Sequence, residues 1–297
     1  MGKFIPDPKA AQEKLKKTLA MIEEGVTTLR NSETWRQFLT FQAKFHHYSF
    51  GNCLLIQVQC PHASYVAGFR TWEKMGRHVR KGEKGIAILA PSSWQKTMQR
   101  KRMNEETGEE EIVEEVVTVR TYRVVYVFDI SQTDGKEAPL VARTLKGDNT
   151  QDLFDALKRF AEERSIPVGY EDCGTAHGYY NPLERRIVLN LKDEQNQRTK
   201  TLAHEIGHAL LHSDCETAEA LDRADRELEA ESVAYIVCQA FGFDSGEYSF
   251  GYLAAWSQAK DFAERMRMLG ERIQNAAKAI IDGISENKTE TDKEEVA

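Results

Sequence analysis

The chain has 297 residues, of which 41% are hydrophobic and 29% are charged, enough apolar sequence for one large domain or two ordinary ones; this excludes wholesale disorder. A net charge of −7 would argue against a nucleic-acid partner if the charges were evenly spread. Residues 1–140 carry 21 Lys and Arg against 17 Asp and Glu, a net +4, whereas residues 141–297 carry 19 against 30, a net −11. We therefore expect the two halves to face different partners.

The cysteines and the apolar segments favour an intracellular protein. The five cysteines are an odd number without a CxxC pair, so they predict neither a disulfide framework nor a thiolate zinc finger. No apolar run reaches the roughly 18 residues that a membrane span needs, and the first residues lack the apolar core of a secretory signal. We expect a cytoplasmic protein in a reducing environment, with no membrane partner.

The first half is typical of helices followed by a β-rich segment. Apolar residues at helical spacing predict two long helices, and Pro61 ends a short third one. The glycines of VRKGEKG (79–85) suit a turn before a strand. Residues 95–115 hold four cations and then seven glutamates, which predicts a solvated loop or hairpin tip. The expected elements are helices over 8–30, 33–48 and 50–60 and strands over 86–91 and 116–130.

A polar stretch separates this half from a second, mostly helical one. Residues 131–150 lose the hydrophobic period, so we place a domain boundary near residue 145. The elements expected beyond it are helices over 151–164, 197–212 and 223–241, a strand over 184–191, and a long amphipathic helix after Asp261. The acidic tail from Ser285 should fray. The predicted fold class is α+β, with an α+β domain over 1–145, a mostly helical domain with a small sheet over 146–285, and a disordered tail over 286–297.

The stretch TLAHEIGHALLH holds an HExxH pattern, formed by His204, Glu205 and His208, inside an apolar helical segment. Residues four apart share a helix face and lie about 6 Å apart along the axis, so both imidazoles can reach one ion at about 2 Å each. Glu205 lies beside them and can reach a metal-bound water, where a general base belongs. We predict His204 and His208 as metal ligands and Glu205 as the catalytic base.

A catalytic zinc ion needs a third protein ligand and an open position for water. The stretch RELEAESVAYIVC presents Glu227 and Glu231 on one helix face, with Glu229 turned away by roughly 200°. We predict Glu227 as the third ligand and Glu231 as the carboxylate that hydrogen-bonds a ligand histidine. The reverse assignment stays open. The ligand types favour Zn²⁺, and they also admit Mn²⁺ or another divalent transition metal.

His212 continues the stripe of His204 and His208. Eight residues of helix place it about 12 Å from His204 along the axis, too far for the two imidazoles to bridge one ion. We therefore expect His212 to be a helix-terminal histidine that the helix dipole favours.

Motifs in both halves resemble known proteins. Residues 35–135 resemble the N-terminal domain of ArdC-type antirestriction proteins, on the motifs YSFGN (48–52), LLIQVQCP (54–61), GFRTWEKMGRHVRKGEKGIAIL (68–89) and VFDISQTDG (127–135). HEIGH, ELEAE (227–231) and FGYLAAWSQ (250–258) are similar to the metallopeptidase domain that accompanies it there and in LtrC-like proteins of conjugative elements. HEIGH with ELEAE also resembles the ImmA/IrrE regulatory proteases. The resemblance implies a zincin-like metallopeptidase domain, with Glu227 as its third ligand.

The resemblance also implies that the first domain binds single-stranded DNA. Ten Lys and Arg stand between Phe69 and Arg102 against two glutamates, a local +8, and aromatic residues are interleaved with them. Stacking of a base on such a ring contributes about 1 to 3 kcal/mol without reading sequence. The expected contacts are Arg70, Trp72, Lys74, Arg77, Arg80, Lys81 and Lys84. Alternatively, Trp72 and Phe69 are core residues below a solvated basic surface.

The expected function is that of a mobile-element protein that binds single-stranded DNA, carries a metal-dependent peptidase domain and protects incoming DNA from restriction. A protein or peptide would be the second partner. One alternative is a regulatory metalloprotease of the ImmA/IrrE kind that cleaves a repressor. Another is a single-stranded DNA-binding protein whose metal site is purely structural.

Overall fold

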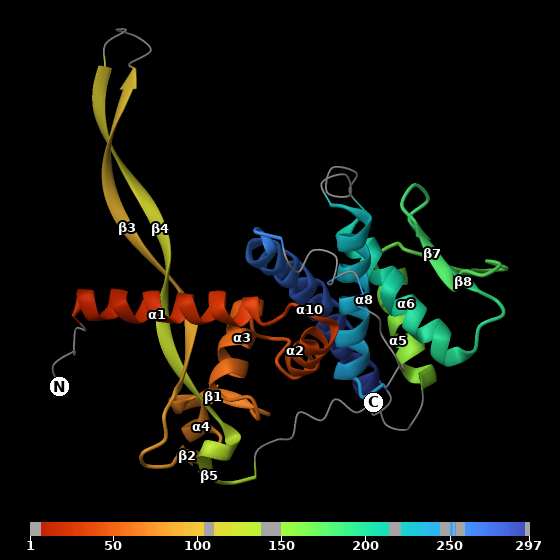
Figure 1. Cartoon of the computed structure of the whole chain (residues 1–297), viewed down its shortest axis with the longest axis horizontal. Helices are drawn as coiled ribbons and strands as arrows, with labels where there is room; N and C mark the ends of the chain where they lie inside the picture. The colour runs from red at the N-terminus through yellow and green to blue at the C-terminus, as the bar shows by residue number, and fades with distance from the viewer. Residues whose placement is uncertain are drawn as a thin grey trace.

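The computed structural model describes residues 7–103, 110–137, 150–213, 221–243, 250–251, 253 and 259–294. Helices and three small sheets make up the molecule (Figure 1), which confirms the predicted α+β class.

The first three helices begin at side-chain caps. The caps of α1 (Pro8–Thr27), α2 (Ser32–Lys44) and α3 (Phe50–Gln59) are Asp7, Asn31 and Ser49, each of which accepts a backbone N–H of the first turn. The first two helices end three and four residues earlier than the apolar pattern predicts, because Thr28 and Phe45 already close the last turns.

A long hairpin of two strands projects from the body (Figure 1). Strand β3 (Ile86–Met103) pairs antiparallel with β4 (Glu110–Asp129), from Ile86 opposite Val127 to Met103 opposite Glu110. Of the two alternatives predicted for residues 95–115, the loop is wrong over 95–103 and 110–115, where the cross-strand ladder continues, and the hairpin is confirmed there. We call residues 86–97 and 116–128 the stalk. Beside it lie β1 (Val66–Gly68), which pairs with β4, helix α4 (Phe69–Lys74), and the pair β2 (Arg77–Val79) and β5 (Thr133–Gly135).

The second half places one helix between a sheet and another helix. Its sheet has the order β6 (Val168–Glu171), β8 (Arg186–Asn190), β7 (Gly178–Asn181), with β6 parallel and β7 antiparallel to β8. Helix α6 (Gln195–Leu211) contacts β7 and β8 and packs most extensively against α8 (Arg223–Ala240). Helices α5 (Thr150–Glu162) and α10 (Phe262–Glu294) complete this layer. Helix α10 thus extends beyond Ser285, where fraying was expected.

Buried side chains of both halves pack into one continuous core. The indole of buried Trp35 on α2 donates to Ser232 on α8 at 3.0 Å. Gly270 on α10 lies against the ring of Phe50, where a Cβ atom would come within 2.3 Å of a ring carbon. A division into domains near residue 145 stays a prediction. None of the described helices is long and apolar enough to cross a membrane.

Candidate metal centre

Close packing of α6 on α8 brings the HExxH pattern next to ELEAE. Gly207 makes this possible, because a Cβ atom there would lie 3.2 Å from the Cα atom of Ala230. On the other side of α6, a Cβ atom on Gly178 of β7 would lie 2.6 Å from the Val188 carbonyl oxygen and 2.8 Å from the methyl of Thr201. Glycines at both contacts therefore hold α6 tightly between its two neighbours.

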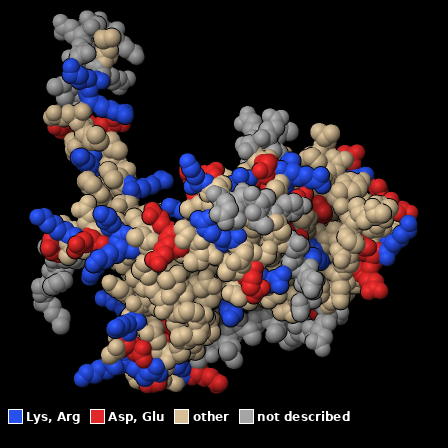
Figure 2. All heavy atoms as spheres, in the orientation of Figure 1, with Lys and Arg blue, Asp and Glu red and all other residues tan. Residues whose placement is uncertain are grey.

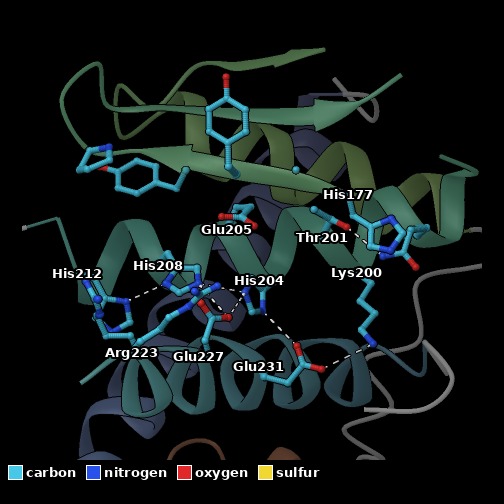
Figure 3. Close-up of a pocket in the computed structure, with 16 residues that line it drawn as sticks. His177, Lys200, Thr201, His204, Glu205, His208, His212, Arg223, Glu227 and Glu231 are labelled. Atoms are coloured by element: carbon cyan, nitrogen blue, oxygen red, sulfur yellow. Dashed lines mark hydrogen bonds and ion pairs between the residues drawn. The ribbon is translucent and has the colours of Figure 1, made fainter. Parts of the chain in front are cut away.

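Three potential ligand atoms converge where the sequence predicts a metal site (Figure 3). The Nε2 atoms of His204 and His208 lie 3.0 Å apart, and they lie 3.6 and 3.9 Å from Oε2 of Glu227. A tetrahedral ion with bonds of about 2.0–2.2 Å places its ligands roughly 3.3–3.6 Å from each other. The three atoms are therefore spaced as one ion requires.

Glu231 fixes the orientation of the first histidine. Its Oε2 lies 3.1 Å from Nδ1 of His204, and its Oε1 lies 3.8 Å from the ammonium of Lys200. A carboxylate only accepts hydrogen bonds, so His204 donates through Nδ1–H and keeps a lone pair on Nε2. The structure thus brings Glu227 to the Nε2 atoms and Glu231 to the opposite side of the imidazole.

A buried chain of side chains orients the second histidine. Glu229, whose side chain is 0% exposed, accepts from Arg272 of α10 at 2.5 Å and from Nε2 of His212 at 2.8 Å. His212 then accepts at its Nδ1, which lies 3.0 Å from Nδ1 of His208. His208 therefore donates through Nδ1–H and directs the lone pair of Nε2 toward Glu227.

The sequence does not predict this series of hydrogen bonds from Arg272 through Glu229 and His212 to His208. Glu229 does turn away from the metal ligands, as its spacing predicts, but it turns toward His212, for which the sequence predicts a role at the helix terminus and not this contact. The HxxxH spacing of His208 and His212 was the available signal for their contact. Arg272 lies 43 residues beyond Glu229, and no local pattern connects the two.

Two imidazole lone pairs that face each other at 3.0 Å repel unless a cation lies between them. Without a metal ion that cation is a proton. Burial lowers the pKa of His204, but the hydrogen bonds that its imidazole donates to Glu227 and Glu231 outweigh this and raise the pKa to about 9. Hydrogen bonds from His204 and His208 hold the pKa of Glu227 well below its usual range. The donor set is thus built to hold positive charge.

Glu205 lines the same cavity as the histidines, on the side of α6 that faces β7 (Figure 3). Its side chain is buried, and burial raises the pKa of its carboxyl, against the opposing effect of His204 and His208. The cavity has a volume of about 750 Å³ and is lined by residues of β7, α6 and α8. A carboxylate with a raised pKa beside a cation-binding cavity is suited to accept a proton.

A second group of potential ligands, His46, His47 and Asp282, also brings three donor atoms within 4.8 Å of one another. Its histidines lie 3.6 and 3.9 Å from Oδ1 of Asp282, whose Oδ2 accepts from Lys278. This ammonium already compensates the carboxylate, so the group offers a weaker site for a cation than the HExxH centre.

Comparison with known proteins supports both halves of this picture. Residues 8–128 match the family model described as the N-terminal domain of anti-restriction factor ArdC, and residues 161–238 match the peptidase M78 model, described as the IrrE N-terminal-like domain. The first half of the chain therefore matches an ArdC-type domain and the second half an IrrE-like domain. The resemblance inferred from the sequence motifs is thereby confirmed.

Individual relatives match most of this chain at low identity. An uncharacterized Bacillus anthracis protein, pXO2-81, is 27% identical in an alignment 328 residues long, which covers 98% of this chain. The chain spans 55% of that protein's length. The metal-free crystal structure of the antirestriction protein ArdC from plasmid R388 superposes with a TM-score of 0.50 at 23% identity, over 80% of this chain and 86% of that one. This likeness shows a common fold. The Mn(II)-bound structure of the same protein gives a TM-score of 0.49 at 21% identity, over 81% and 84% of the two chains.

The predicted DNA contacts of the ArdC-type domain differ in exposure. Trp72 is fully buried, and its indole donates to the Phe128 carbonyl at 3.0 Å, so the expectation that it stacks on a base does not fit this structure. Arg77 is half-buried and donates to Thr133 at 2.8 Å. Arg80 is exposed but lies 2.8 Å from Glu83 and 3.5 Å from Asp134. The other four predicted contacts are exposed and do not form an ion pair like that of Arg80: they are Arg70, Lys74, Lys81 and Lys84.

Proposed function

We propose that this protein binds single-stranded DNA through its ArdC-type domain and hydrolyses a peptide bond at a metal centre in its IrrE-like domain, in the service of protecting incoming mobile-element DNA from restriction. The observation that carries the enzymatic part is the convergence of His204, His208 and Glu227 at 3.0–3.9 Å beside buried Glu205. The net charge of +4 over residues 1–140 supports the DNA-binding part.

The donor set fits a divalent metal ion. Two imidazoles and one carboxylate suit Zn²⁺ and also Mn²⁺, and both histidines are held with their Nε2 lone pairs toward Glu227. When bound, such an ion supplies Lewis acidity toward a carbonyl and lowers the pKa of water. His204, His208 and Glu227 would hold it.

The remaining residues do the proton transfer and the orientation. Glu205 accepts a proton from the attacking water and returns it to the leaving amine. Glu231 and His212 keep the two ligand histidines in one tautomer. Strand β7 is an edge strand and lines the cavity, so its backbone can pair with an extended peptide substrate.

Metal stoichiometry of the full chain, purified without chelators, tests the centre. We expect one equivalent of a divalent transition metal by elemental analysis, and its loss in His204→Ala, His208→Ala and Glu227→Ala. Glu231→Ala should retain metal at reduced affinity, whereas exposed Glu184→Ala serves as a matched control. Retention by Glu227→Ala with loss by Glu231→Ala would reverse the ligand assignment. Absence of metal from the wild type refutes the enzymatic proposal.

Transfer of a plasmid into a restricting host tests the biological part. The gene should raise recovery of the incoming plasmid in a restricting recipient and leave recovery unchanged in a restriction-deficient one. A Glu205→Gln variant that still binds metal separates the roles, because loss of protection then requires the proton acceptor. Full protection by this variant would favour a purely structural metal site.

A second candidate function follows from the match of residues 161–238 to the IrrE-like model. The protein would then cleave a transcriptional repressor, and the basic domain would dock an acidic protein. Co-expression with the repressor encoded nearest to its gene tests this. Cleavage that disappears with Glu205→Gln favours regulation over DNA protection.

A further inference from the structure

One face of the stalk exposes aromatic rings where a two-layered sheet normally exposes polar side chains. Tyr122, Tyr126 and Phe128 of β4 alternate with inward residues and so share a face. Tyr122 is 58% and Tyr126 47% exposed, whereas Val127, on the opposite face, is buried in the core. Phe69, at the start of α4 and 48% exposed, extends the series, with its ring 6.4 Å from that of Phe128. We call these four residues the aromatic row.

Small residues of β3 lie opposite the rings. Tyr126 pairs with Ala87 and Tyr122 with Pro91 across the ladder. Gly85 lies under the row, where a Cβ atom would come within 2.9 Å of Cβ of Tyr126 and 3.1 Å of Cζ of Phe128. Half-buried Leu89, opposite Val124, is the large side chain of β3 between these two pairs. Tyr122 and Tyr126 nevertheless stay 58% and 47% exposed, because the residues directly opposite them are small.

The charged side chains of the stalk have one sign. The stalk contains Lys96, Arg120 and Arg123 and no Asp or Glu. Arg120 pairs with Ser93 across the ladder and lies on the same face as the row. Lys84, which is exposed, precedes Gly85 at the other end. Figure 2 shows Lys and Arg side chains along this part of the hairpin.

We propose that the aromatic row is a stacking surface for the unpaired bases of a single-stranded nucleic acid, with Arg120 and Lys84 against its phosphates. This inference rests on the proposed DNA-binding function and gives it a location. Exposed rings beside cations match what a single strand presents, which is a flat apolar base and a negative phosphate at each step. A duplex would offer the phosphates but not the faces of its bases.

The spacing of the rings suits a strand that runs along β4. Tyr122 and Tyr126 are four residues apart, or about 13 Å at 3.3 Å per residue, and Tyr126 and Phe128 are about 7 Å apart. Successive rings can therefore stack on different bases of one extended strand. The role that buried Trp72 cannot fill passes to residues that are exposed on β4 and at the start of α4.

Fluorescence anisotropy with a labelled 20-nucleotide single strand tests the row on the full chain. Tyr122→Ala and Tyr126→Ala should each weaken binding by about fivefold or more, and Tyr122→Phe and Tyr126→Phe should retain it, because the ring and not the hydroxyl does the stacking. Tyr170→Ala on β6 removes a tyrosine that is 37% exposed and is the matched control, with unchanged affinity expected. Unchanged melting temperatures would show that the alanine variants fold.

The salt dependence of binding adds an independent readout. Arg120→Gln should lower the slope of log K against log salt by about 0.7, the value for one phosphate contact on a single strand. Wild-type affinity in both tyrosine-to-alanine variants would overturn the row as a stacking surface while leaving DNA binding intact. Failure of the wild type itself to bind single strands would instead overturn the proposed DNA-binding function, and the row with it.

Discussion

The metal centre and the stalk place functional side chains in opposite ways. In the metal centre, each of the two ligand histidines is oriented by a further side chain, Glu231 for His204 and His212 for His208, and the partners of His208 reach as far as Arg272 on α10. In the stalk, the aromatic row rests on a two-stranded ladder and is exposed on one side. A reaction at one atom requires fixed tautomers and distances, whereas a surface that stacks on any base requires only accessible rings and charge of one sign. Substitutions in the metal centre and in the stalk should therefore impair different properties of the protein.

The largest expected effect is a loss of peptidase activity when the proton acceptor Glu205 is replaced. Glu205→Gln keeps the shape of the side chain and removes its basicity, so peptidase activity should fall by about 10²- to 10⁴-fold. Affinity for single-stranded DNA should not change, because Glu205 lies on α6 and not on the stalk. Activity is measured on a cleaved partner once it is known, and binding by anisotropy. A parallel loss of both activities would contradict the separation of the two regions.

The next effect concerns the buried carboxylate behind His208. Glu229→Ala removes the partner of both Arg272 and His212, and the loss of one member of a buried ion pair typically costs about 3 to 5 kcal/mol. The free energy of unfolding, from urea titration, should fall by this amount. Metal affinity should fall by about 10- to 100-fold, because His208 loses its orientation.

Glu231→Ala is the matched comparison for that effect. It removes the partner of the other histidine, and its side chain is 21% exposed, so the loss of stability should be smaller while the loss of metal affinity is similar. Equal free energies of unfolding for Glu229→Ala and the wild type would show that the buried hydrogen bonds of Glu229 do not stabilise the fold.

Local spacing predicted the part of the metal centre that lies within single helices. The i, i+4 pairs His204 and His208, and Glu227 and Glu231, fall on the faces that helical geometry assigns to them, because α6 and α8 are regular. The contact of His212 with Glu229 was not predictable in the same way, since it depends on how two helices pack and on Arg272 from a third. Helix faces are local properties of a sequence, whereas partners across helices are not.

The stalk was the harder region to predict from sequence. The seven glutamates of residues 105–115 are typical of solvated loops, and they masked strands that continue to Met103 and resume at Glu110. What decides the outcome is pairing across the ladder, for example Trp94 opposite Val119, which no single segment encodes. The burial of Trp72 likewise follows from β4, whose Phe128 carbonyl accepts its indole N–H.

The stability of the metal-free protein should depend on pH through the protonation of His204. Its folded pKa, raised to about 9, lies above the unfolded value near 6.5. The protonated imidazole therefore contributes stability that is fully present below about pH 6.5 and is lost as pH rises through 9. Melting temperatures of the chelator-treated chain should fall over this window relative to His204→Gln, which lacks the group. Metal-loaded protein should not show this difference, because the ion replaces the proton.

The smallest effect should come from an ion pair of the hairpin. Arg100 and Glu115 approach to 3.3 Å, but their side chains are 75% and 52% exposed. Water screens such a pair, and exposed ion pairs contribute about 0–1 kcal/mol. Arg100→Gln and Glu115→Gln should therefore leave the unfolding free energy unchanged within error. The same chemistry is essential in Glu229 and Arg272 only because water is excluded there, and a cost for Arg100→Gln as large as that for Glu229→Ala would contradict this explanation.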